Sequence, residues 1–423
     1  MKGLRVNRKV MRKIIFLHMF LFLFAGIFNS VLKNPSVLSG ITELLAWAEF
    51  LFCIAIKAFP SRMEKRGARA ELWIVILILF VSAVSYLLNG YSLRFLLNGF
   101  RSVFKYFAFY FSCVTLLEYE DIQRFFEIAY RFIILNVIAC TIEYFVLGYK
   151  GDFCSGLFGI EKVNSYINIF IVVMATYGAA GYIHKQFPLK KMIIIELCCM
   201  YISVLSELKF FFFEVAIIFV LNLVFYKPSK RTFSILAVGI AVIAILPILV
   251  GRFWSSSSSE YLSWQGLLIY IERSNTFGYS TFNDIGRING ISRINSFFFS
   301  DRPSYWGLGL GYCDYGSSFI GTYEYLHYMW FTYLLTYLEL GWIGLMLYVC
   351  FMLAPAIKAF RLKKSVNTDF SKTVLAICFT LGFMCVVLLV YNSTLRNLPA
   401  YFAFFIMSFY SLVNRELERG ATQ

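Results

Sequence analysis

The chain has 423 residues, of which 60% are hydrophobic and only 15% are charged. A soluble protein of this length carries many more charged residues, so the composition excludes a soluble architecture and predicts a membrane protein. The formal net charge of +15 would suggest nucleic-acid binding in a soluble protein. In a membrane protein, the question is instead which side of the membrane carries the positive residues.

Apolar stretches of about 20 residues, long enough to cross a hydrocarbon core about 30 Å thick, recur along the whole chain. Each must be helical, because backbone exposed to lipid has to satisfy its own hydrogen bonds. The sequence therefore predicts an all-α, polytopic membrane protein with about twelve transmembrane helices. The predicted spans are 14–32, 39–58, 72–89, 96–117, 126–149, 164–183, 192–206, 210–226, 233–250, 326–354, 373–391 and 399–413.

Basic residues gather in alternate connections between these spans. The basic clusters lie at 2–13, 57–69, 185–191, 227–231 and 358–372. Because positive residues stay on the cytoplasmic side, both chain termini are expected in the cytoplasm. The clusters also suit anionic lipid headgroups, so nucleic acid is not implied.

One connection, at 251–325, is much longer than the others and is predicted to face outward. It divides the chain into transmembrane helices 1–9 (1–250), a large outer loop (251–325) and transmembrane helices 10–12 (326–423). Loops of this length are either functional or disordered, and the many aromatic residues of this one indicate that it folds. The span that follows is longer than a bilayer needs, so its first turn or two is expected to stand above the membrane.

The outer loop contains one predicted short helix, at 284–299. Apolar residues recur there near helical spacing, and the sequence Asp301-Arg302-Pro303 ends the helix. The glycines of the following stretch, 307–311, predict a flexible turn.

Most of the ten cysteines lie within apolar spans, where a thiol behaves as a small hydrophobe. Only Cys154 and Cys313 fall in predicted outer loops. Both a disulfide between them and two separate thiols remain open from the sequence.

The outer loop carries arginine but no lysine, which suggests that bidentate donors matter there, as they would for a diphosphate. The alternative is that these arginines pair with nearby carboxylates; for Arg287, Asp284 is one turn earlier. The loop arginines are Arg252, Arg273, Arg287, Arg293 and Arg302.

His327 is the one histidine in a predicted outer region, and it stands where the loop enters the tenth span. It could act as a base or hydrogen-bond donor facing a substrate hydroxyl. The alternative is a structural residue within an aromatic belt at the membrane interface, since tyrosines surround it.

Three cations lie on one side of the predicted fourth span: Arg94, Arg101 and Lys105. Cations at membrane depth are costly and usually face a polar cavity, so these residues could bind a lipid phosphate. Arg94 and Arg101 could instead extend to the outer surface. Lys209, in the tight turn between the seventh and eighth spans, adds another outward cation.

Residues 286–347 resemble a signature of the bacterial O-antigen polymerase and O-antigen ligase superfamily. The matching features are Gly286-Arg287 opening an outer helix, Pro303 followed by glycines at 307, 309 and 311, His327 beginning the next span, and the string Glu339-Leu340-Gly341-Trp342-Ile343-Gly344 within it. Tyr328 departs from the pattern, because ligases usually have Asn after the histidine.

The resemblance implies an inverting, metal-independent glycosyltransferase with a GT-C-like fold. It would polymerise undecaprenyl-diphosphate-linked oligosaccharide repeat units of O-antigen, capsule or exopolysaccharide at the outer face of the bacterial cytoplasmic membrane. Arg287 would stabilise the departing diphosphate, with Arg293, Arg302 and Lys209 assisting, and His327 would contact the acceptor hydroxyl. The lipid tails would lie near Arg94, Arg101 and Lys105.

Two other functions stay open from the sequence. A ligase would move finished glycan to lipid A core or protein, whereas a flippase would transport lipid-linked units; a flippase would be expected to show pseudo-symmetric halves. Expected partners are membrane lipids, a flippase and chain-length regulator proteins. Neither a cofactor nor a metal ion is expected, because the sequence contains no nucleotide-binding loop or ligand cluster.

Overall fold

The computed structural model describes residues 2–159, 164–226, 285–301, 303–314 and 317–421, together with the single residues 230, 231, 233 and 272. All regular secondary structure in this part of the chain is helical, which confirms the predicted all-α class. The predicted span at 233–250 and most of the loop at 251–284 lie outside the described residues.

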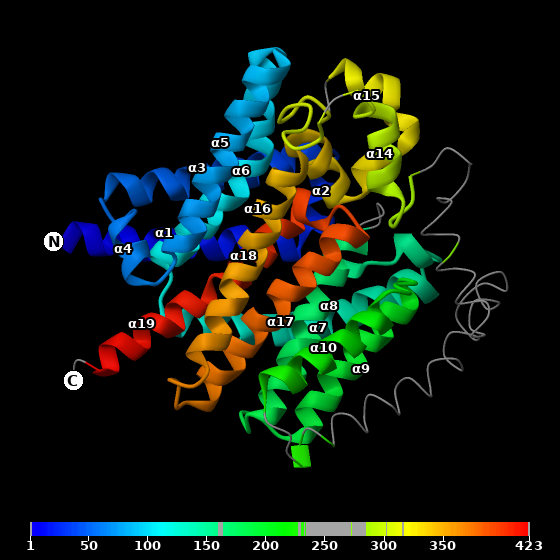
Figure 1. The fold of residues 1–423 in the computed structure, drawn as a ribbon. Coiled ribbons are helices and arrows are strands. Elements are labelled where there is room, and N and C mark those ends of the chain that lie inside the picture. Colours follow the sequence, from blue (N-terminus) through cyan, green and yellow to red (C-terminus); the bar gives the residue numbers. More distant parts are fainter. Residues whose placement is uncertain are drawn as a thin grey trace.

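Long helices form the bundle and short ones connect them at its ends (Figure 1). In chain order the α-helices are α1 (Lys2–Leu23), α2 (Ala25–Leu32), α3 (Pro35–Ala55), α4 (Ser61–Lys65), α5 (Arg69–Asn89), α6 (Leu93–Leu116), α7 (Tyr119–Phe145), α8 (Asn164–Ile183), α9 (Leu189–Leu205), α10 (Phe211–Phe225), α14 (Gly290–Phe298), α15 (Ser318–Tyr323), α16 (Thr332–Leu362), α17 (Asp369–Tyr391), α18 (Pro399–Met407) and α19 (Phe409–Ala421). The 3-10 helices are η1 (Gly151–Phe153), η2 (Gly156–Phe158), η5 (Glu324–Leu326), η6 (Tyr328–Trp330) and η7 (Thr394–Arg396).

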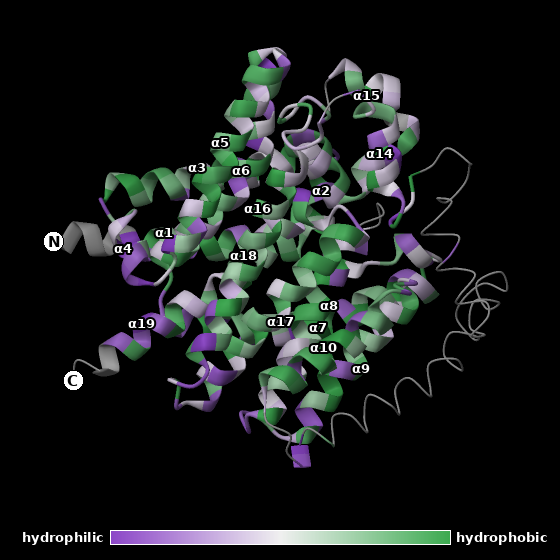
Figure 2. Cartoon of the chain, viewed as in Figure 1, coloured by the Kyte–Doolittle hydropathy of each residue, from purple (hydrophilic) through white to green (hydrophobic). Residues whose placement is uncertain are grey.

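Among the described residues, six helices are long and apolar enough to cross a membrane: α3, α5, α7, α8, α16 and α17. The bent pair α1–α2 makes a seventh if it is one span, and α10 is a shorter apolar helix. Apolar residues cover the middle of the bundle, and polar residues gather toward its ends (Figure 2). The chain is therefore a polytopic α-helical membrane protein.

The first predicted span, 14–32, is not one straight helix. It breaks at Phe24, and its two halves are bent by 78°. The turn at 156–159 packs against the second half so closely that a Cβ on Gly26 would lie 2.4 Å from the backbone nitrogen of Gly159. Hydropathy does not reveal a contact between distant segments, so the bend within the predicted span could not be predicted from the sequence.

The connections that were predicted to face outward meet at one end of the bundle. The Asn89 side chain donates to the Gly307 carbonyl at 3.1 Å, and the amide of Thr332, at the start of α16, donates to the Asn392 carbonyl at 3.0 Å. The helices α14 and α15 lie at this same end (Figure 1). We call it the α14 end.

The predicted inner connections meet at the opposite end, where Glu118 caps the start of α7. Its carboxylate pairs with Arg62 at 2.7 Å and with Arg415 of α19. Burial alone would raise the pKa of Glu118, but the hydrogen bond from Arg415 and the nearby positive charges outweigh it and lower the pKa. Arg12 of α1 pairs with Asp121 of α7 at 2.7 Å, so both terminal helices reach this end.

The long helix α16 is interrupted at Gly341, whose φ of 66° and ψ of −165° are not helical. The segment 304–311 fills the break: the amides of Leu308 and Gly309 donate to the carbonyls of Leu338 and Glu339 at 2.7 and 3.0 Å. A non-helical backbone at membrane depth is tolerated only when such partners satisfy it. Residues 307–311 are buried, so the predicted flexible turn is instead a packed element.

Two predicted helix starts are also displaced. The outer helix α14 begins at Gly290 rather than at Gly286-Arg287, because the Gly286 amide binds the Asn289 side chain in a turn. The tenth span begins at Thr332 rather than at 326, so His327 precedes the helix. The residues between form the 3-10 turn η6, in which the Trp330 amide donates to the His327 carbonyl at 3.0 Å.

Candidate functional site

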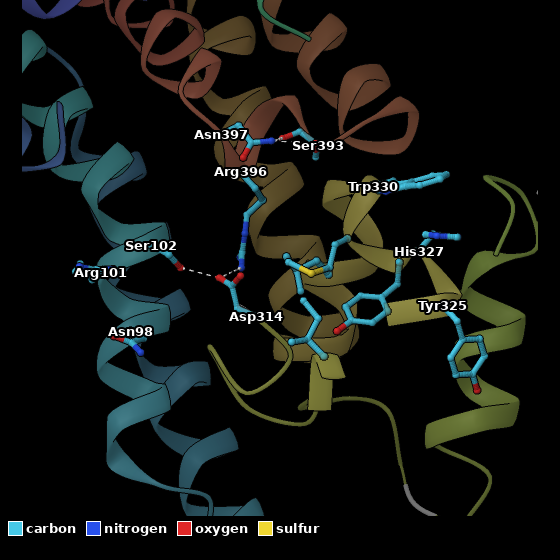
Figure 3. A pocket seen from close by; sticks show the side chains of 14 residues that line it. Asn98, Arg101, Ser102, Asp314, Tyr325, His327, Trp330, Ser393, Arg396 and Asn397 are labelled. Atoms are coloured by element: carbon cyan, nitrogen blue, oxygen red, sulfur yellow. Dashed lines mark hydrogen bonds and ion pairs between the residues drawn. The ribbon is translucent and has the colours of Figure 1, made fainter. Parts of the chain in front are cut away.

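A cavity of about 670 Å³ opens at the α14 end between α6, η7 and the segment 314–335 (Figure 3). Its size is that of a typical small-molecule site. Polar, charged and aromatic side chains line it together. They are Asn98, Arg101, Ser102, Asp314, Ile320, Tyr325, His327, Tyr328, Met329, Trp330, Leu335, Ser393, Arg396 and Asn397. We call it the outer cavity.

The carboxylate of the outer cavity belongs to Asp314, whose side chain is 19% exposed. Ser102 of α6 donates a hydrogen bond to it at 3.3 Å, and Arg396 of η7 approaches it at 3.5 Å. Figure 3 shows Asp314 between these two partners. Three segments that are distant in sequence therefore fix the position of one partly exposed carboxylate.

Arg396 also pairs with Glu339, which lies beside the break in α16. The Arg396 guanidinium donates to Glu339 at 2.8 Å, and the fully buried Glu339 carboxylate accepts the Gly311 amide at 2.8 Å as well. Burial alone would lower the pKa of Arg396, but the charges of Glu339 and Asp314 outweigh it and raise the pKa. Arg396 thus links the packed segment 304–311 to the carboxylate that faces the cavity.

His327 lines the side of the cavity away from α6, beside exposed aromatic rings (Figure 3). Its imidazole stacks on Trp330, with ring centroids 4.1 Å apart. His327 has a φ of 53°, the left-handed region that non-glycine residues rarely adopt. Trp330 and Tyr325 are 47% and 49% exposed, so they offer flat apolar surfaces to a ligand.

Arg101 connects the predicted lipid site to this cavity. It lines the cavity from α6, and its guanidinium pairs with Glu43 of α3 at 3.2 Å. Lys105 shares the same carboxylate at 3.4 Å. Arg94 is exposed near the start of α6. The structure therefore brings Arg101 and Lys105 together around an acidic partner that the sequence did not indicate.

Arg287 does not line the outer cavity, although it lies at the same end of the bundle. Its Nε donates to the Tyr391 carbonyl at 3.2 Å, and its guanidinium carbon lies 4.7 Å from the Tyr391 ring and 5.6 Å from the Phe331 ring. Phe331 directly follows Trp330 of the cavity. The two predicted catalytic residues, Arg287 and His327, thus contact neighbouring aromatic residues, Phe331 and Trp330, but do not line one pocket.

The other predicted diphosphate ligands are dispersed. Lys209 lies in a turn whose neighbour Phe210 stacks on Tyr391 at 4.0 Å, so its turn meets the residue that holds Arg287. Arg293 lies on α14 and does not line the outer cavity. Arg302 lies outside the described residues, as does Asp284, the proposed structural partner of Arg287.

Sequence reasoning missed Asp314, Arg396, Ser393 and Asn397 as cavity residues. Arg396 was the one basic residue of a short outer connection, which is a weak signal. Glu339 was noted only within the family string. Its acidic side chain inside an apolar span was the stronger signal, because such residues usually have a buried partner.

Cys154 and Cys313 are not bridged to each other in this structure, and both are buried. The thiol of Cys154 points instead to the Cys140 carbonyl, at 3.6 Å. Cys140, Glu143 and Cys154 each offer one atom that could bind a metal ion, and these three atoms lie within 4.8 Å of one another. The sequence showed no such cluster, because Cys140 falls within a predicted span.

No protein-family model matches the chain, and no curated protein sequence matches it either.

Proposed function

We propose that this protein is an inverting, metal-independent glycosyltransferase that polymerises undecaprenyl-diphosphate-linked repeat units at the outer face of a bacterial cytoplasmic membrane. The outer cavity is the observation that supports this proposal most. It joins hydrogen-bonding side chains to exposed aromatic rings, a combination that suits sugars, at one end of an apolar bundle. The twelve-span, GT-C-like architecture belongs to the same proposal.

In this proposal, the acceptor sugar occupies the outer cavity and its ring packs on Trp330 or Tyr325. The lipid diphosphate of the donor approaches from the bilayer, where Arg101 and Lys105 beside Glu43, and Arg287 beside Tyr391, supply positive charge. Charge develops on the phosphate oxygens as the donor bond breaks, and fixed guanidinium groups stabilise it.

The chemical step is a direct displacement. The acceptor hydroxyl oxygen bonds to the anomeric carbon of the donor while the bond from that carbon to the phosphate oxygen breaks, and the lipid diphosphate leaves. The hydroxyl proton passes to a base, for which Asp314 and His327 both line the cavity. Asp314 is the better placed of the two, because Ser102 and Arg396 hold its carboxylate in position.

The proposed function is tested by the glycans of a strain that lacks this chain. We expect single repeat units to reach the cell surface while long polymer is lost, because only the joining step is missing. Lipid-linked polymer that accumulates in the membrane would instead indicate a ligase. Lipid-linked single units that stay inside the cell would indicate a flippase. Re-expression of the wild-type chain should restore the polymer and serves as the control.

The outward orientation of the α14 end has its own test. Gly321 of α15 has open space around it, so Gly321→Cys should fold normally. It should react with a membrane-impermeant maleimide in intact spheroplasts, whereas Ser365→Cys, in an exposed connection at the opposite end, should react only after the membrane is opened. The wild-type protein gives the background from native cysteines. The reverse pattern would mean that the cavity faces the cytoplasm.

One observation favours transport as a second candidate. His18 of α1 and Glu49 of α3 are fully buried and 3.7 Å apart. Ionisable groups inside a membrane bundle are costly and often mark a proton or substrate path. A transporter would use such a pair directly, whereas the transferase proposal leaves it without a role.

A further inference from the structure

The cluster of Cys140, Glu143 and Cys154 lies at the α14 end, where the end of α7 meets the connection to α8. Cys140 and Glu143 lie on α7, and Cys154 follows η1. Both cysteines are completely buried, and their sulfur atoms lie within 4.8 Å of each other. They are 14 residues apart in the chain. Two thiols held this close can either be bridged to each other or share a metal ion.

The described part of the cluster has too few ligands for a structural zinc site. The Gly156 amide donates to the Glu143 carboxylate at 2.5 Å, and the Asn136 side-chain amide points its N–H at the Cys140 sulfur at 3.6 Å. The Glu143 carboxylate and the Cys140 sulfur therefore each have a hydrogen-bond partner within the protein. A structural zinc site also closes with four protein ligands, whereas the cluster contains three ligand-type residues among those described. Glu143 has a structural role instead, because its carboxylate accepts the Gly156 amide and so binds the turn at 156.

We propose that Cys140 and Cys154 form an intramolecular disulfide in the membrane-inserted protein. The inference uses the outward orientation of the α14 end, which is part of the proposed function. The outer compartment is oxidising, and a protein disulfide that meets the two thiols before folding buries them supplies the oxidant. The two thiols lose two protons and two electrons to form one S–S bond, and the incoming disulfide is reduced to two thiols.

The bridge would fix the α7–α8 connection at two places. Cys154 would be joined covalently to α7, and its carbonyl already accepts a hydrogen bond from Ser206 at the end of α9. The nearby Gly151 packs against the carboxylate of Glu207 in the same turn as Lys209; a Cβ there would lie 3.4 Å from the Glu207 carboxyl carbon. The disulfide would therefore tie to α7 a loop that already contacts the turn carrying Lys209.

The test counts thiols in the full-length protein. Cells are quenched in acid to stop thiol exchange, the protein is dissolved in SDS, and free thiols are labelled with a maleimide that adds polymer mass. The chain has ten cysteines, so eight labels, ten minus two, are expected without reductant and ten after reduction. Peptide mass spectrometry of the unreduced wild-type protein should recover the segments around 140 and 154 linked together.

Single substitutions sharpen the count. Cys140→Ser and Cys154→Ser each remove one cysteine but release its partner, so each variant should take up one label more than the wild type. Cys198→Ser, a half-buried control outside the cluster, should take up one label fewer. Ten labels on the unreduced wild type would overturn the proposal, and one equivalent of zinc in the purified protein would then assign the cluster to a metal. If Gly321→Cys still labels from outside, that failure leaves the orientation intact.

Discussion

The Asp314→Asn variant is expected to transfer glycan about 10²–10⁴-fold more slowly than the wild-type protein, because the amide cannot accept the acceptor proton. Its shape and its place beside Ser102 and Arg396 are kept, so protein level and donor affinity should change little. The measurement is the initial rate of polymer formation by purified protein with a lipid-linked repeat unit, at saturating and at limiting donor.

Asp301→Asn is the matched control, since Asp301 is an exposed carboxylate of the same outer segment that does not line the cavity. It should leave the rate unchanged. The His327→Gln variant separates the two base candidates. If that variant loses turnover while Asp314→Asn keeps it, the proton passes to the imidazole and the assignment of Asp314 is wrong.

Local sequence patterns predicted two features: where an apolar span lies, and which connections share one end of the bundle. The helix α8 (Asn164–Ile183) coincides with its predicted span. Its apolar run is unbroken, and most of it is buried inside the bundle. The alternation of basic clusters correctly grouped the connections into two ends, as the pairs around Glu118 show. Which end faces outward remains a prediction.

Features that depend on contacts between distant segments were not predictable from the sequence. The bend at Phe24 requires the turn that contains Gly159, and the break at Gly341 requires the segment 304–311. Neither partner can be recognised from hydropathy. A single apolar stretch predicts a continuous helix. A break in that helix is tolerated only when another part of the chain supplies partners for the backbone groups that lose their hydrogen bonds.

The candidate site also contains some residues that the sequence predicted and others that it did not. His327 and Arg101 were predicted separately, as a catalytic and a lipid-binding residue, and the fold places both on one cavity. Asp314 and Arg396 could not be found, because their roles come from partners 212 and 57 residues away in the chain, Ser102 and Glu339. Spacing along a helix reveals neighbours on that helix alone.

Loss of the Arg396 guanidinium should have the largest effect on stability. In Arg396→Gln, the fully buried Glu339 would keep, among the described residues, only the Gly311 amide as a charge-stabilising partner, with the Asp314 carboxylate nearby. Breaking a buried ion pair by removing one member costs about 3–5 kcal/mol. We expect the free energy of unfolding to fall by that amount, measured by tryptophan fluorescence as SDS is titrated into detergent micelles.

A second substitution shows whether the buried charge is the cause. Adding Glu339→Gln to Arg396→Gln removes the uncompensated carboxylate, so the double variant should recover part of the lost stability, and the double-mutant cycle gives the coupling energy. Arg101→Gln is the matched control: its pair with Glu43 is 64% exposed on the arginine side and should contribute at most about 1 kcal/mol. Equal stability of Arg396→Gln and the double variant would mean that Arg396 acts through packing of η7 rather than through its charge.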